Sequence, residues 1–112
     1  MRSWNKLFYF ASANKKYNNY LLNMKIEEVN ELIEIECNKI KQELIQKNVD
    51  YNNSLYLPNM FNQNPIEGIK ARISDKINRI ASKGIDDKTE DSISDLIGYL
   101  IHLKIMMNNE RL

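Results

Sequence analysis

Three stretches of the chain repeat apolar residues at helical spacing. Between Met24 and Asn48 the apolar positions are Ile26, Val29, Ile33, Cys37, Ile40 and Leu44. Steps of three and four place side chains on one face of an α-helix. The pattern therefore predicts a helix over residues 24–48 with one buried stripe. Cys37 lies in that stripe and is interpreted as a small core residue rather than a nucleophile.

The second stretch has a well-marked beginning and end. Asn64 can cap a helix, Pro65 suits the first helical position and Glu67 suits the first turn. Gly84 is typical of the residue that stops a helix. The apolar positions between these ends are Ile66, Ile69, Ile73, Ile77 and Ile80. A second helix is expected, with these isoleucines as its core stripe.

The third stretch begins near Asp87 and Glu90, a spacing that resembles a capping box. Its apolar positions are Ile93, Leu96, Ile97, Leu100, Ile101 and Ile105. They form a wide apolar face on a third helix. His102 lies on this helix and is interpreted as a partly exposed residue rather than a catalytic base.

The remaining segments complete the predicted fold. Residues 49–65 form a long loop rich in asparagine and in large apolar side chains, which are expected to pack against the helices. Leu7–Leu22 is a possible fourth helix. Because no run of alternating β-branched residues indicates a sheet, the fold class is all-α, a small bundle of three main helices.

Composition separates the amino end from the rest. The chain has 112 residues, typical of one domain. Residues 1–23 carry four basic groups, six of the aromatic side chains and no acid. We assign 1–23 to a basic, aromatic leader and 24–112 to the helical domain. The leader is interpreted as a packing arm or an extension before Met24, with a membrane or nucleic-acid contact as the alternative.

Several classes of site are excluded by the counts of single residue types. One cysteine cannot form an intramolecular disulfide or a thiolate zinc site, and one histidine cannot form a His-rich metal site. The net charge of +1 gives no whole-chain argument for nucleic acid. No segment reaches the roughly 20 apolar residues of a membrane-spanning helix. We expect a cytoplasmic protein, in a host cell if it is encoded by a phage.

Three polar clusters could carry chemistry. They are Lys47, Asp50 and Tyr51 at the end of the first helix, Arg72, Asp75, Lys76 and Arg79 on the second, and Asp91 and Asp95 on the third. Two carboxylates one turn apart can hold Mg²⁺, and the cation can bridge phosphate oxygens that Arg and Lys neutralise. The alternative is structural, because acids and bases at these spacings also form ordinary surface pairs.

The order of these motifs resembles the nucleotide modification-associated domain 1 family of phages and bacteria. The matching blocks are Lys47-Asn48-x-Asp50-Tyr51, then Ile73-Ser74-Asp75-Lys76-Ile77-Asn78-Arg79-Ile80, then Asp91-Ser92-Ile93-x-Asp95-Leu96-Ile97-Gly98-Tyr99. The resemblance spans residues 26–108. The family's glycine after the tyrosine is Asn52 here, a residue that tolerates a left-handed backbone.

The resemblance implies a helical bundle related to MazG-type nucleoside triphosphate pyrophosphatases. It implies that a nucleotide is bound by Lys47, Asp50, Tyr51, Asp75, Lys76 and Arg79, and that Mg²⁺ is bound by Asp91 and Asp95. The glutamate-rich metal motifs of those enzymes are not clearly matched, so nucleotide binding is a firmer expectation than hydrolysis.

Three function classes follow from the sequence. The leading hypothesis is a phage-type nucleotide-binding protein of nucleotide metabolism or modification. The second is a counter-defence binder that sequesters a nucleotide signal or inhibits a host defence protein such as a CRISPR effector. The third is a dimerisation module built on the isoleucine-rich stripes. Broad apolar faces on three helices lead us to expect a homo-oligomer in each case.

Overall fold

A computed structural model describes residues 21–58, 60, 63–86 and 88–109. These residues form α3 (Ile26–Asp50), the 3₁₀ turn η1 (Ser54–Tyr56), α4 (Pro65–Lys83) and α5 (Glu90–Asn109). They contain no strand, which confirms the predicted all-α class. The assignment of Leu7–Leu22 to a fourth helix falls almost wholly outside the described residues. Among the described helices, none combines the length and apolar character that crossing a membrane requires.

The ends of α4 are as predicted, because the signals that set them are local. The Asn64 side-chain oxygen accepts a hydrogen bond from the Ile66 backbone N–H at 3.0 Å, and Pro65 occupies the first helical position. Gly84 ends the helix with φ of 78°, a left-handed value that costs glycine little. The isoleucine stripe is also confirmed, since Ile69 and Ile80 are buried in the core.

The start of α5 is fixed by contacts between Asp86 and Thr89, and the capping box predicted at Asp87 and Glu90 stays a prediction. Asp87 lies outside the described residues. The contacts that are seen join Asp86 and Thr89 reciprocally: the Asp86 N–H donates to Thr89 Oγ1 at 3.1 Å and the Thr89 N–H donates to Asp86 Oδ1 at 3.1 Å. Thr89 is almost fully buried, so its hydroxyl needs these partners. This exchange fixes the turn from which α5 begins.

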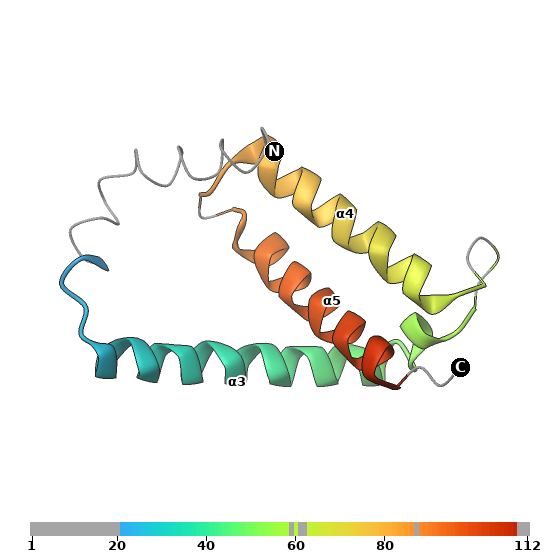
Figure 1. The fold of residues 1–112 in the computed structure, drawn as a ribbon, viewed down its shortest axis with the longest axis horizontal. Helices are drawn as coiled ribbons and strands as arrows, with labels where there is room; N and C mark the ends of the chain where they lie inside the picture. The colour runs from blue at the N-terminus through green and yellow to red at the C-terminus, as the bar shows by residue number, and fades with distance from the viewer. Residues whose placement is uncertain (1–20, 59, 61–62, 87, 110–112) are drawn as a thin grey trace.

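The core lies between α4 and α5, which run side by side (Figure 1). Its buried apolar residues are Ile69, Ile80, Ala81 and Met106, and the buried polar residues are Thr89 and His102. The interpretation of His102 as a partly exposed residue is therefore wrong, because the side chain lies on the face of α5 that carries Gly98 and Met106.

The helix α3 was predicted correctly, but its burial was not. None of its residues is buried, and α3 meets α5 only toward its carboxyl end (Figure 1). Ile40 and Leu44 are half-buried there, whereas Ile26 and Ile33 are 76% and 55% exposed. Cys37 is exposed too, so its interpretation as a core residue is wrong. Helical spacing identifies the face of a helix but not whether another helix covers it.

The loop after α3 packs only in part. Leu55 and Tyr56 of η1 are half-buried, but Leu57 and Met60 are exposed. The prediction that its large apolar residues pack is thus correct for η1 and wrong for Leu57, Met60 and the exposed Tyr51, while Phe61 lies outside the described residues. Asn52 has φ of 54°, in the left-handed region that asparagine tolerates.

The crossing of α3 and α5 depends on Gly98. A Cβ atom at this position would lie 2.9 Å from Cδ1 of Leu44, whereas at Gly68 on α4 it would meet nothing within 4 Å. Alanine gains about 1 kcal/mol over glycine inside a helix. We expect Gly68→Ala to stabilise the protein by up to about that amount, and Gly98→Ala to be up to about 1 kcal/mol less favourable because the Leu44 side chain must move. Urea unfolding of both variants measures the difference, and equal gains would show that the crossing is loose.

Candidate functional site

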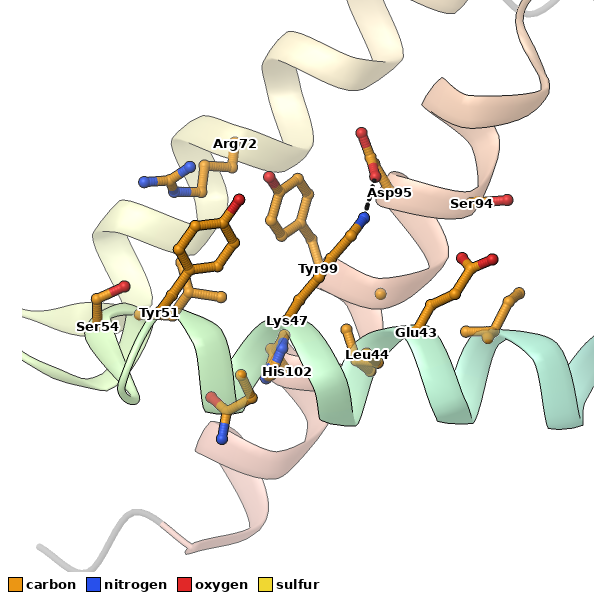
Figure 2. A pocket seen from close by; sticks show the side chains of 14 residues that line it. Glu43, Leu44, Lys47, Tyr51, Ser54, Arg72, Ser94, Asp95, Tyr99 and His102 are labelled. Carbon is orange, nitrogen blue, oxygen red and sulfur yellow. Dashed lines mark hydrogen bonds and ion pairs between the residues drawn. The ribbon is translucent and has the colours of Figure 1, made fainter.

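Each of the three helices contributes two charged or aromatic side chains that lie one helical turn apart. The pairs are Lys47 and Tyr51 from the end of α3, Arg72 and Lys76 from α4, and Asp95 and Tyr99 from α5. A separation of four residues places two side chains on the same face of a helix, about 6 Å apart along its axis. The three faces meet where α3 crosses α5, and they bring charges and aromatic rings together (Figure 2).

Asp95 links all three helices. Its Oδ1 is 3.2 Å from Lys47 Nζ and its Oδ2 is 2.9 Å from Lys76 Nζ. Lys47, Asp95 and Lys76 thus form one ion-pair bridge. The Asp95 carboxylate is 28% exposed and the Lys76 side chain is 16% exposed, so the contact between them is largely shielded from water. The Lys47 side chain is 55% exposed. One carboxylate shared by two ammonium groups leaves a net positive charge.

The charges of the bridge shift two pKa values. Burial raises the pKa of Asp95, but the hydrogen bonds and charges of Lys76 and Lys47 outweigh it, and the net pKa lies below the ordinary value. The hydrogen bond to Asp95 raises the pKa of Lys47 above its ordinary value, against the opposing effect of burial. Both shifts favour the charged forms, so the bridge is ionised at neutral pH.

A cavity of about 200 Å³ opens beside this bridge. Its polar wall holds Glu43, Lys47, Arg72 and Asp95, and its aromatic wall holds Tyr51 and Tyr99 (Figure 2). The apolar residues Ile40, Leu44 and Leu55 also line it, together with Gly98 and His102. An enclosed surface with a few charged groups is typical of small-molecule sites.

Arg72 and the two tyrosines supply groups suited to a planar, anionic ligand. The Arg72 Cζ atom lies 5.9 Å from the centre of the Tyr99 ring, which holds the guanidinium by a cation–π contact. Tyr51 is 67% exposed, so its ring is open to a ligand. A guanidinium binds phosphate through paired hydrogen bonds, and an aromatic ring stacks on a nucleobase.

Tyr56 and His102 form a hydrogen-bonded pair behind the cavity. Tyr56 Oη lies 2.7 Å from His102 Nδ1, and the rings meet edge to face with centres 5.5 Å apart. Burial lowers the pKa of His102 and raises the pKa of Tyr56. Both groups are therefore neutral at pH 7, and the pair fastens η1 to α5.

Stability is expected to fall as the pH drops below about 6.5, the ordinary pKa of histidine. The unfolded chain then binds a proton on His102, while the folded protein binds it only below its own, lower pKa. Between the pKa of His102 in the folded protein and the ordinary histidine pKa, the free energy of unfolding rises with pH by at most about 1.4 kcal/mol per pH unit. Denaturant unfolding at pH 5 to 7 measures the slope. In His102→Asn this slope should disappear, and an unchanged slope would assign it to other groups.

The structure brings together four of the residues predicted for the site. Lys47 and Tyr51, predicted to bind a nucleotide, and Asp95, predicted to bind metal, line the cavity, and Lys76 bonds to Asp95 from α4. The sequence predicted that Asp50, Arg79, Asp91 and Asp95 would converge on one cleft, and of these four only Asp95 lines the cavity.

The other four predicted residues lie elsewhere. The Asp50 carboxylate accepts a hydrogen bond from Gln46 Nε2 at 2.9 Å on α3 itself. Asp75, Arg79 and Asp91 are exposed and are not among the residues that line the cavity. Among the described residues, no group of three or more His, Cys, Asp or Glu side chains is placed to hold a metal ion. Magnesium binding by Asp91 and Asp95 stays a prediction.

Three residues of the site were not predicted. Arg72 was recognised only as part of the α4 cluster, and Tyr99 only as the last residue of the third motif. Tyr56 was seen only as one apolar residue of the loop. The four-residue spacing of Arg72 to Lys76 and of Asp95 to Tyr99 was the signal that could have identified the first two.

Comparison of the chain with known proteins finds no matching family model, no matching curated protein and no matching solved structure. The resemblance to the nucleotide modification-associated domain 1 family stays a prediction. The functional argument below therefore depends on the geometry of the cavity.

Proposed function

We propose that the cavity between α3, α4 and α5 binds a nucleotide. The observation that carries the proposal is the meeting of Lys47 and Arg72 with two tyrosine rings around one cavity. The phosphate would bind the ammonium of Lys47 and the guanidinium of Arg72, and the base or sugar would lie against Tyr51 or Tyr99. Asp95 has a positioning role, since it holds Lys47 and Lys76 in place.

The size of the cavity limits how much of the ligand it encloses. Pockets that bury a whole drug-sized ligand usually measure about 300–1,000 Å³, whereas this cavity measures about 200 Å³. Part of the nucleotide would remain outside, next to the exposed ring of Tyr51.

A Mg²⁺ ion held by Asp91 and Asp95 is the second part of the proposal. Both Asp95 oxygens bond to ammonium groups, so the carboxylate would have to exchange one lysine for the ion. A phosphate that draws Lys47 away would make that exchange easier. Nucleotide binding and cation binding would then strengthen each other.

Isothermal titration calorimetry with nucleoside mono-, di- and triphosphates, with and without Mg²⁺, tests the proposal. We expect at least one nucleotide to bind and to raise the unfolding temperature by mass action. The corresponding nucleoside without phosphate is the matched control and should bind more weakly. If no nucleotide binds in either condition, the proposal is wrong.

Chromatography of the ligand after incubation separates two roles in nucleotide metabolism or defence. A hydrolysed or modified nucleotide would identify an enzyme of nucleotide metabolism. A nucleotide that is bound and recovered unchanged would support the alternative, a protein that sequesters a nucleotide signal. Both roles use the same cavity.

A further inference from the structure

The first half of α3 exposes an apolar stripe that continues a packed one. Ile26, Val29 and Ile33 are 76%, 38% and 55% exposed, and Cys37 is exposed on the same face. By helical spacing this face continues to Ile40 and Leu44, which are half-buried near α5. No described helix lies along the first half (Figure 1). One contiguous face is thus covered at its carboxyl end and uncovered at its amino end.

The charges around the uncovered stripe narrow the choice of what covers it. Residues 26–38 hold five acids and no base: Glu27, Glu28, Glu31, Glu34 and Glu36. Within the part of the chain that the structure describes, the ion pair of this group joins Glu36 to Lys39 at 3.7 Å, and both side chains are well exposed. A second copy that paired its own stripe here would bring acids against acids. The surface is complementary to a segment that is apolar and basic.

Such a segment occurs in the same chain. Residues 1–20 carry Arg2, Lys6, Lys15 and Lys16, no acid, and the aromatic residues Trp4, Phe8, Tyr9, Phe10, Tyr17 and Tyr20. We propose that residues 1–20 dock on the stripe formed by Ile26, Val29, Ile33 and Cys37. The aromatic side chains cover the apolar residues, and the lysines and Arg2 approach the flanking glutamates.

The connection between the two parts permits this contact. Residues 21–24 form a turn in which the Met24 N–H donates to the Leu21 carbonyl at 3.2 Å, immediately before α3. A turn at this point permits the preceding chain to fold back toward α3. The stripe from Ile26 to Cys37 is about 17 Å long at the helical rise of 1.5 Å per residue. Twenty residues span that length even if they are fully helical.

The full-length protein contains its own reporter, because Trp4 is the only tryptophan. If residues 1–20 dock as proposed, the fluorescence of Trp4 is blue-shifted relative to free tryptophan amide. The variant Ile33→Asp should shift the emission to longer wavelength, because it puts a charge into the stripe. The matched control is Ile35→Asp, which changes a residue of similar exposure, 48%, on the opposite side of α3 and should leave the emission unchanged.

The salt dependence of the Trp4 emission and the sedimentation of the protein show whether residues 1–20 or a second copy cover the stripe. High salt should shift the Trp4 emission of the native protein to longer wavelength, because it screens the lysine–glutamate attraction. Circular dichroism checks that both variants keep their helices. Emission equal in the native protein, Ile33→Asp and Ile35→Asp would overturn the proposal. A blue shift that develops only as sedimentation shows dimers forming would also overturn it, in favour of a second copy.

Discussion

Replacing Asp95 with Asn is expected to lower the free energy of unfolding by about 1–3 kcal/mol. The Asn side chain is similar in size but uncharged, so Lys47 and Lys76 lose their shared counter-charge. Lys76 is only 16% exposed, and its ammonium cannot regain full hydration without moving. The 55% exposure of Lys47 keeps the expected loss below that of a fully buried pair.

Asp91→Asn is the matched control, because Asp91 is an exposed carboxylate one turn earlier on the same helix. Its replacement should change stability by only a few tenths of a kcal/mol, as for other exposed first-turn acids. Urea unfolding at pH 7 measures both variants. Equal small losses would show that the three-helix bridge contributes nothing to folding.

The pH dependence gives an independent check on Asp95. Its pKa is lower in the folded protein than in the unfolded chain, so its contribution to stability is present above about pH 4 and is lost as the pH falls through the folded value. Asp95→Asn should remove this part of the acid destabilisation. The difference in stability between the native protein and the variant should therefore shrink from pH 5 to pH 2.

The same two variants separate the roles proposed for the carboxylates in ligand binding. If Asp91 and Asp95 hold Mg²⁺, both changes abolish the part of nucleotide binding that depends on magnesium. If Asp95 serves only to position the lysines, Asp91→Asn has no effect, and Asp95→Asn weakens nucleotide binding both with and without magnesium, because Lys47 is no longer held beside the cavity.

The parts of the fold that could be predicted are those that local chemistry decides. The Asn64 cap, the Gly84 stop and the left-handed Asn52 each depend on the conformational preference of one residue and its neighbours. The burial of α3 depends on which helix lies against it, and periodicity carries no information about that. The stripe of Ile26 and Ile33 is therefore helical as predicted, yet exposed.

The candidate site shows the same limit. Lys47 was predicted as part of the polar cluster at the end of the first helix, and Asp95 as one of two carboxylates one turn apart on the third. Which residues of each cluster line the cavity was harder to predict, because this depends on how each helix is rotated about its own axis and on how far along it the crossing lies. Asp50 lies three residues after Lys47, only about 60° away around α3, yet its carboxylate accepts a hydrogen bond from Gln46 on the same helix and does not line the cavity. Arg79 lies seven residues beyond Arg72 on a similar face, but about 10 Å further along α4.

This difference between the two arginines gives the most direct test of the site. Arg72→Met is expected to weaken nucleotide binding about 10- to 100-fold, because a charge-assisted hydrogen bond contributes about 1.5–3 kcal/mol. Methionine keeps the length and the helix propensity of arginine, so α4 should stay intact. The loss should appear for nucleotides and not for the nucleoside, since the guanidinium is proposed to contact phosphate.

Arg79→Met removes the same charge from the same helix at an exposed position that does not line the cavity. The variant loses only the long-range attraction between the Arg79 guanidinium and the phosphate of the ligand. Salt at 0.1 M screens that attraction beyond about 10 Å. We therefore expect a change of less than about threefold for Arg79→Met at 0.1 M salt. Calorimetry on both variants at equal salt measures the contrast. Equal losses would show that α4 attracts the ligand through general charge, and a loss confined to Arg79→Met would place the phosphate outside the cavity, near the end of α4.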